Sequence, residues 1–199
     1  VQNWVDLVVT FDDFMTCARF CDTVARADGI VKKLVTAVAD PVPRSFPTVR
    51  GAVAPGKHVA LLMLADYALD WYGDLRDQAG GTEVYRKDEA AIAAEALVPL
   101  YEYAWNHTTL YALKVDRNVT YLQTLFAPGD HLDKVAHMIA VFGDEVPMHL
   151  EFVRLHGRIG CFGLQVVNYT TEERLREIIA YHEAQGCPIF DPHTYVLED

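Results

Sequence analysis

Blocks of alternating apolar and polar positions predict strands and helices along most of the 199-residue chain. Short runs rich in Val, Leu and Ile indicate strands at residues 5–11, 31–38, 58–64, 82–86, 119–126, 146–155 and 158–167. Apolar positions three and four residues apart predict helices at residues 12–27, 66–78, 88–97, 131–142 and 171–185. This order predicts an α+β fold in which ferredoxin-like βαβ units form one mainly antiparallel sheet with helices on one face.

The length suits one domain with a sizeable core, residues 1–199, with sub-halves at 1–98 and 99–199. The chain starts at Val1 without a Met, and it stops at Asp199 without a helix or a polar tail. We therefore expect a fragment of a longer protein. The second face of the sheet should be partly apolar, where a missing domain or a second subunit docks.

The net charge of the chain limits the kinds of molecule that it can bind. The net charge of −11 argues against a nucleic-acid surface, because phosphate binding needs basic patches, although Arg154 and Arg158 could focus small anions locally. No apolar run is long enough to predict a membrane span. Cys17 and Cys21, four residues apart on a predicted helix, are poorly placed for a disulfide, so we expect a reducing, cytoplasmic location.

The densest polar cluster lies in residues 100–114, which should form a short helix or its entry turn. His107 is a candidate general base, since an imidazole exchanges a proton near neutral pH. Asn106 could orient a substrate oxygen, and Trp105 could cover a ring. The alternative is a structural histidine at a helix start, capped by Asn106.

A second polar passage closes the chain. His193 and Tyr195 alternate with Thr194, so they should point to one side of an extended segment, or belong to a surface strand that leads to a missing domain. His149 and His156 have a spacing known from metal sites, but an offset of seven places them on opposite faces of a strand. We predict no metal site, and no glycine-rich phosphate loop indicates cofactor-binding residues.

Three passages, residues 100–114, 149–163 and 188–199, carry a family resemblance. They resemble the C-terminal substrate-side, or cap, domain of FAD-linked oxidases and dehydrogenases of the vanillyl-alcohol oxidase (PCMH) type, which include glycolate oxidase and D-lactate dehydrogenase relatives. In that family a preceding domain holds FAD. The cap domain, a sheet with helices on one face, closes over the flavin and shapes the substrate pocket.

The resemblance implies a substrate-binding cap domain of an enzyme that oxidises a hydroxyl-bearing small molecule by hydride transfer to FAD. His107 and His193 would then be catalytic, and Trp105, Asn106 and Tyr195 would bind the substrate. The His-x-Gly-Asp-Gly-Asn metal loop of the family's lactate and hydroxyglutarate dehydrogenases is missing from the sequence, which argues against metal-assisted substrate binding. The expected partners are the protein's own FAD domain and the substrate, and the chain alone should bind no FAD and be inactive.

A different class stays open. A ferredoxin-like α+β domain could be a non-catalytic ligand-binding or dimerisation module that never meets a flavin, and a homodimer is an option in either class. His107 and His193 around one cavity would favour the enzyme. Wide separation, with both side chains exposed, would favour the module.

Overall fold

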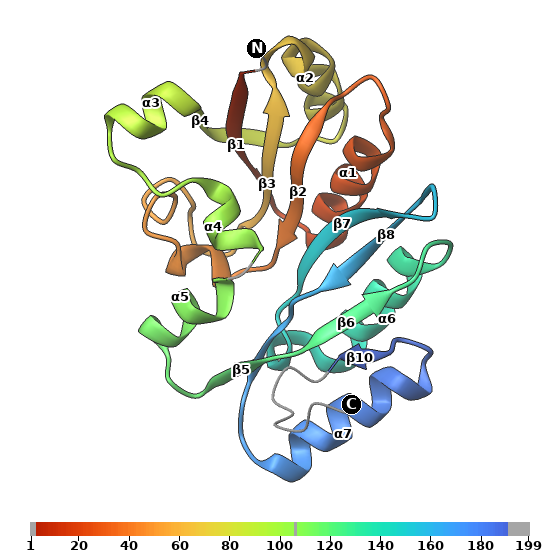
Figure 1. Cartoon of the computed structure of the whole chain (residues 1–199). Coiled ribbons are helices and arrows are strands. Elements are labelled where there is room, and N and C mark those ends of the chain that lie inside the picture. Colours follow the sequence, from red (N-terminus) through yellow and green to blue (C-terminus); the bar gives the residue numbers. More distant parts are fainter. Residues whose placement is uncertain (1–2, 106, 191–199) are drawn as a thin grey trace, which may run out of the picture.

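An eight-stranded sheet in the order β10-β6-β8-β7-β2-β3-β1-β4 organises the computed structural model, which describes residues 3–105 and 107–190 (Figure 1). The paired strands are antiparallel, so the prediction of a mixed fold with a mainly antiparallel sheet is confirmed. The strands of this sheet are β1 (Trp4–Phe11), β2 (Lys32–Val38), β3 (His58–Ala65), β4 (Thr82–Asp88), β6 (Gln123–Phe126), β7 (His149–Leu155), β8 (Arg158–Gly163) and β10 (Ile189–Phe190).

The sheet consists of two halves with the same connectivity. The first runs β1, α1 (Phe14–Arg26), β2, β3, α2 (Leu69–Gln78), β4, and its strands lie in the order β4-β1-β3-β2. The second runs β6, α6 (His131–Phe142), β7, β8, α7 (Glu172–Ala184), β10, and its strands lie in the equivalent order β10-β6-β8-β7. Each is a split βαβ arrangement. The halves join where Thr36, Ala37 and Val38 pair with Glu151, Leu150 and His149.

Helix starts follow from local side-chain chemistry. The Asp13 carboxylate accepts a hydrogen bond from the Thr16 backbone N–H and caps α1. Thr171 caps α7 in the same way through the Arg174 N–H. Both caps agree with the predicted starts, because each side chain satisfies an N–H that the first turn leaves without a partner.

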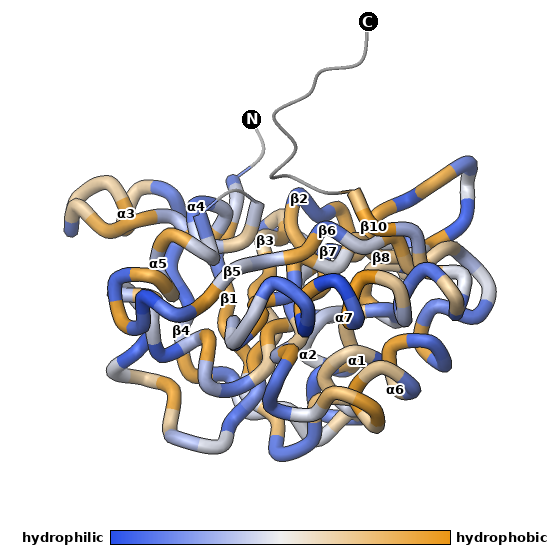
Figure 2. Tube along the Cα trace, turned by 90° about the horizontal axis from the view of Figure 1, so that it is seen from below, coloured by the Kyte–Doolittle hydropathy of each residue, from blue (hydrophilic) through white to orange (hydrophobic). Residues whose placement is uncertain are grey.

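One face of the sheet packs against the long helices. Side chains of alternate residues in β1, such as Leu7 and Val9, meet the apolar stripe of α1 in a core that also includes Tyr72 of α2 and Met138 of α6. Figure 2 shows α1, α2 and α6 together on one side of the strands. All four cysteines are free and buried. In this core a thiol behaves as a small apolar group.

The second face is covered only in its first half. Val8, Leu61 and Met63 pack there against the short segments η1 (Val42–Ser45), α4 (Leu100–Ala104) and α5 (Thr108–Val115). As a result, β3 is buried on both faces, which explains its near-continuous apolar sequence.

The remaining elements lie at the edges. They are η2 (Asp66–Ala68), α3 (Glu89–Ala94), η3 (Gly143–Glu145), and the strands β5 (Val119–Tyr121) and β9 (Val166–Asn168), which pair in a small second sheet. Within the described ranges, no helix has both the length and the apolar character needed to cross a membrane.

Candidate functional site

The polar segment at residues 100–114 contributes two short helices, α4 and α5, where the sequence predicts one short helix or its entry turn. The Leu100 backbone N–H donates to the buried carboxylate of Asp6 over 2.9 Å, which fixes the start of α4 on β1. Tyr103 is fully buried, and its ring stacks on Phe46 with 4.9 Å between centroids. The segment is therefore anchored to the first half of the sheet.

His107 lies at the joint between the two helices. Its Nδ1 is 2.9 Å from the Glu102 carboxylate and 3.2 Å from the Glu102 carbonyl oxygen. The side chain is 41% exposed, so solvent and ligands can reach it. A carboxylate beside an imidazole can hold the ring in one orientation, which suits a group that must meet a substrate proton in a fixed geometry. The catalytic role of His107 stays a prediction.

Trp105 follows α4 and is 42% exposed. Its ring packs on Tyr101, with centroids 5.5 Å apart and planes tilted by 30°. It lines two adjoining hollows, one beside α5 and one on the open face of the sheet. The substrate-binding role of Trp105 stays a prediction. Asn106, His193 and Tyr195 lie outside the described residues.

The hollow on the open face is the larger of the two, and we call it the open-face groove. It has a volume of about 530 Å³, within the range of roughly 300–1,000 Å³ that is typical of small-molecule sites. It is lined by Lys33, Leu34, Val35, Trp105, Gln123, Glu151, Phe152, Val153, Phe162, Leu164 and Phe190. Apolar side chains predominate in this wall, and the lining residues come from strands of both halves and from the end of α4.

The groove exists because β2 and β7 separate. Their pairing is limited to residues 36–38 and 149–151, and beyond these residues the two strands diverge, as Figure 1 shows. Residues 33–35 and 152–153 then line the groove and a smaller hollow of about 260 Å³. The wedge between the halves is therefore open at the end where the groove lies.

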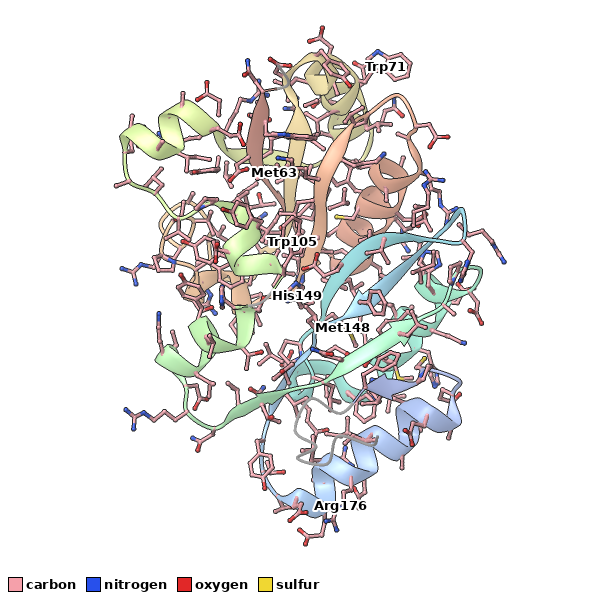
Figure 3. The ribbon with its side chains drawn as sticks, in the orientation of Figure 1. Met63, Trp71, Trp105, Met148, His149 and Arg176 are labelled. Carbon is pink, nitrogen blue, oxygen red and sulfur yellow. The ribbon has the colours of Figure 1, made fainter. Side chains whose placement is uncertain are left out.

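A buried polar network forms part of the groove floor. Oε1 of Glu151 accepts a hydrogen bond from Nε2 of His149 over 2.7 Å, and Oε2 accepts one from the Thr36 hydroxyl over 2.7 Å. His149 and Thr36 are fully buried, whereas Glu151 is 7% exposed and lines the groove. Nδ1 of His149 has no partner among the described residues. Figure 3 shows His149 at the start of β7, close in the view to Trp105 at the end of α4.

This network was missed from the sequence, where residues 150–155 were interpreted as plain strand. The sequence does contain a signal for this network. His149 and Glu151 are two residues apart, so in a strand they share one face, and a largely apolar strand is expected to bury both side chains. His156 occupies the hairpin turn with φ of 48°, while His149 is buried in the sheet.

A second buried network holds the second half together. Gln165 accepts a hydrogen bond from the Thr124 hydroxyl over 2.6 Å, and its amide nitrogen is 3.1 Å from Nε2 of His182. Burial lowers the pKa of His182, whose Nδ1 also contacts the Ile178 carbonyl oxygen. These groups line neither hollow. Their arrangement fits a structural role between the sheet and α7.

Metal binding finds no support in the geometry. Among the described residues, no group of three or more His, Cys, Asp or Glu side chains is placed to hold an ion. Glu151 has only one such neighbour, His149, in its hydrogen-bond shell. Among the groove-lining residues that the structure describes, Glu151 is the one carboxylate.

Comparison with known proteins shows the fold. No family model and no curated protein matches the chain. Two solved structures of alkyldihydroxyacetonephosphate synthase, in crystal forms P1 and P212121, match it with a TM-score of 0.56, at 9% and 8% identity. Each match covers 92% of this chain and 39% of the synthase chain. The chain thus has the fold of one part of a longer enzyme and spans well under half of that enzyme's length.

Proposed function

We propose that the chain is the substrate-binding cap domain of an FAD-dependent oxidoreductase that oxidises a hydroxyl-bearing small molecule. The observation that carries the proposal is the open-face groove, which lies beside Trp105 on the side of the sheet that the long helices leave uncovered. A cap domain needs such a surface, because the substrate must lie between it and the flavin.

Two further observations support the proposal. The three sequence passages that resemble the flavoenzyme family include residues 100–114, which contribute Trp105 to the groove, and residues 149–163, which contribute Glu151 and Phe162. The same fold also occurs as 39% of a longer synthase chain. Both fit a domain whose remaining partner is the rest of its own protein.

The flavin would be held elsewhere. The groove wall is largely apolar with a carboxylate in its floor, which fits a small substrate or the face of a ring but repels a diphosphate. When bound by the full protein, FAD would supply the hydride acceptor. This chain's residues would bind and orient the substrate and exclude water, and His107 would take the hydroxyl proton. Asn106, His193 and Tyr195 remain part of the proposal as substrate or catalytic residues.

The test is a pair of histidine variants in the full-length flavoprotein. We expect His107→Ala to lower kcat/KM by roughly 10²–10⁴-fold, the loss typical of a positioned general base. Since His107 is 41% exposed, its replacement should cost under about 1 kcal/mol of stability. His156→Ala, in the exposed hairpin turn, is the matched control and should keep its turnover. His193→Ala tests the second predicted histidine. Near-wild-type turnover for both His107→Ala and His193→Ala would contradict the catalytic assignment.

One observation favours the alternative of a non-catalytic ligand-binding module. His107 faces Glu102 and lines neither hollow, whereas the groove is formed by this chain without any flavin. A module of this kind would bind its ligand in the groove and show no dependence on His107. Flavin reduction by substrate in the full-length protein separates the two functions.

A further inference from the structure

We propose that Glu151 determines which ligands the open-face groove accepts. These ligands have an apolar body that ends in a hydrogen-bond donor, which is either a neutral alcohol or a protonated amine. Ligands that end in a carboxylate are excluded. The inference deepens the proposed function by naming the class of substrate, and it rests on that function only for the chemistry that follows binding. Binding itself needs no flavin and can be measured on this chain.

First, the hydrogen bonds of the Glu151 carboxylate show what kind of group it can still bind. A carboxylate only accepts hydrogen bonds, and its two oxygens offer about four acceptor sites. His149 and Thr36 occupy one site on each oxygen, at 2.7 Å in both cases. Both partners are fully buried, whereas Glu151 lines the groove, so a ligand there would meet the acceptor sites that these two hydrogen bonds leave over. A ligand group that meets Glu151 must therefore donate.

The second step concerns rigidity. Thr36 and Glu151 lie directly opposite each other in the β2–β7 pairing, and His149 is two residues from Glu151 on the same strand face. Both backbones belong to the sheet, so the carboxylate is held in place before any ligand arrives. A pre-positioned acceptor in largely apolar surroundings gives orientation and specificity at little entropic cost.

The third step is the match between the rest of the groove and an apolar body. Phe162, Val153 and Leu164 form the wall near Glu151, and Trp105 and Phe190 are the large aromatic side chains at its edge. The cation among the lining residues is Lys33, whose ammonium lies 4.4 Å from the centre of the Trp4 ring. A carboxylate at the floor would face Glu151 with like charge, and that arrangement is strongly unfavourable in a weakly hydrated site.

The experiment uses four probes with the same body: benzyl alcohol, protonated benzylamine, toluene and benzoate. Each is titrated into the 199-residue chain, and binding is followed by NMR at the indole N–H of Trp105. That signal is assigned by its loss in Trp105→Phe, since the chain has three tryptophans. We expect benzyl alcohol and benzylammonium to bind about 10- to 100-fold more tightly than toluene, as for a hydrogen bond to a charged group, and benzoate to bind most weakly.

Two variants isolate Glu151. Glu151→Gln should abolish the preference for benzylammonium over benzoate, while Glu172→Gln, the same charge change at an exposed site on α7, should preserve it. Val153→Glu leaves the network intact and adds a carboxylate two residues along the same face. It should strengthen benzylammonium binding even if Glu151→Gln fails to fold.

Three results would overturn the proposal: benzoate binding as tightly as benzyl alcohol, an unchanged order of probes in folded Glu151→Gln, or no binding of any probe. Its failure is distinguishable from failure of the proposed function. A chain that binds donors but supports no flavin reduction in the full-length protein keeps the inference and loses the oxidoreductase.

Discussion

Two buried carboxylates lie on the same face of one sheet, in halves of the same topology, and their surroundings differ. Asp6 in the first half lies under α4, is 1% exposed, and accepts one hydrogen bond from the Leu100 N–H, while its Oδ1 has no partner among the described residues. Glu151 in the second half has both oxygens hydrogen-bonded and opens to a groove. Asp6 is therefore enclosed with one oxygen unpaired, whereas Glu151 is fully hydrogen-bonded on the protein side and lines a groove.

The difference arises partly from one pair of equivalent connections, in addition to α4 and α5, which cover the first half. Between β2 and β3, residues 39–57 cross the second face and place Val42, Phe46 and Val49 over it. Between β7 and β8, at the equivalent place in the second half, the chain turns within His156 and Gly157. The same strand order therefore gives a closed face in one half and an open face in the other. The groove is present in the second half because its β7–β8 connection is too short to cover the second face of the sheet.

The largest effect should come from breaking the cover of the first half. Tyr103→Ala removes a fully buried ring that stacks on Phe46 and contacts the Thr48 hydroxyl, so we expect a loss of about 3–5 kcal/mol in the free energy of unfolding. Trp105→Ala, two residues on and 42% exposed, should cost under about 1 kcal/mol. Urea unfolding of both variants measures the contrast. Equal losses would mean that α4 does not close the first half as described.

The next effect concerns the network under the groove. Glu151→Ala leaves the buried donors of His149 and Thr36 without their acceptor, and we expect a loss of about 2–4 kcal/mol. Glu151→Gln keeps an amide oxygen that can accept one of these hydrogen bonds, so its loss should be about half as large. Thermal and urea unfolding give both values. An unchanged stability in Glu151→Ala would show that the network contributes nothing to the fold.

A smaller effect should appear as a pH dependence at Asp6. Burial, with a contribution from Glu89, raises the pKa of Asp6 from 3.8 to about 6 against the lowering effect of the Leu100 N–H. The stability that Asp6 contributes is fully present below pH 3.8 and is lost as pH rises through about 6. Asp6→Asn removes this dependence.

We therefore expect the free energy of unfolding of Asp6→Asn, relative to that of the wild type, to increase by about 1–2 kcal/mol when the pH is raised from 5 to 8. Unfolding free energies of both proteins at the two pH values provide the measurement. Glu145→Gln, at a surface carboxylate whose pKa is lowered by Arg174, serves as the control and should show no such gain. A gap between wild type and Asp6→Asn that stays constant with pH would contradict an ionising, enclosed Asp6.

Local features of the fold were predictable because they depend on neighbouring residues. Asp13 and Thr171 cap helices that were predicted at residues 12–27 and 171–185, and the two residues between the predicted strands 146–155 and 158–167 form a hairpin turn. Pairing between distant strands was not predictable. The period of two assigns Thr36 and Glu151 each to a face, but nothing local says that β2 meets β7 at that position, 115 residues apart.

The candidate site divides in the same way. Trp105 was predicted as a pocket residue because dense polar and aromatic residues in a short helix are unusual, and it lines the groove. Glu151 and His149 resemble ordinary strand residues in the sequence. Their hydrogen-bonded network forms only when Thr36, in the other half of the sheet, pairs with Glu151. A site formed where two strands separate has no continuous signature in the sequence.

The proposed function requires that the open face of the second half is turned toward the rest of the full-length protein. Val153→Cys places one thiol in the groove wall, and the four native cysteines are buried and should react slowly. Asp77→Cys, at a carboxylate whose side chain is 69% exposed on the first half, is the control. Thiol labelling is timed in this chain and in the full-length protein. We predict that Val153→Cys reacts readily in the chain and at least about tenfold more slowly in the full-length protein, with Asp77→Cys unchanged. Equal labelling of Val153→Cys in both would contradict it.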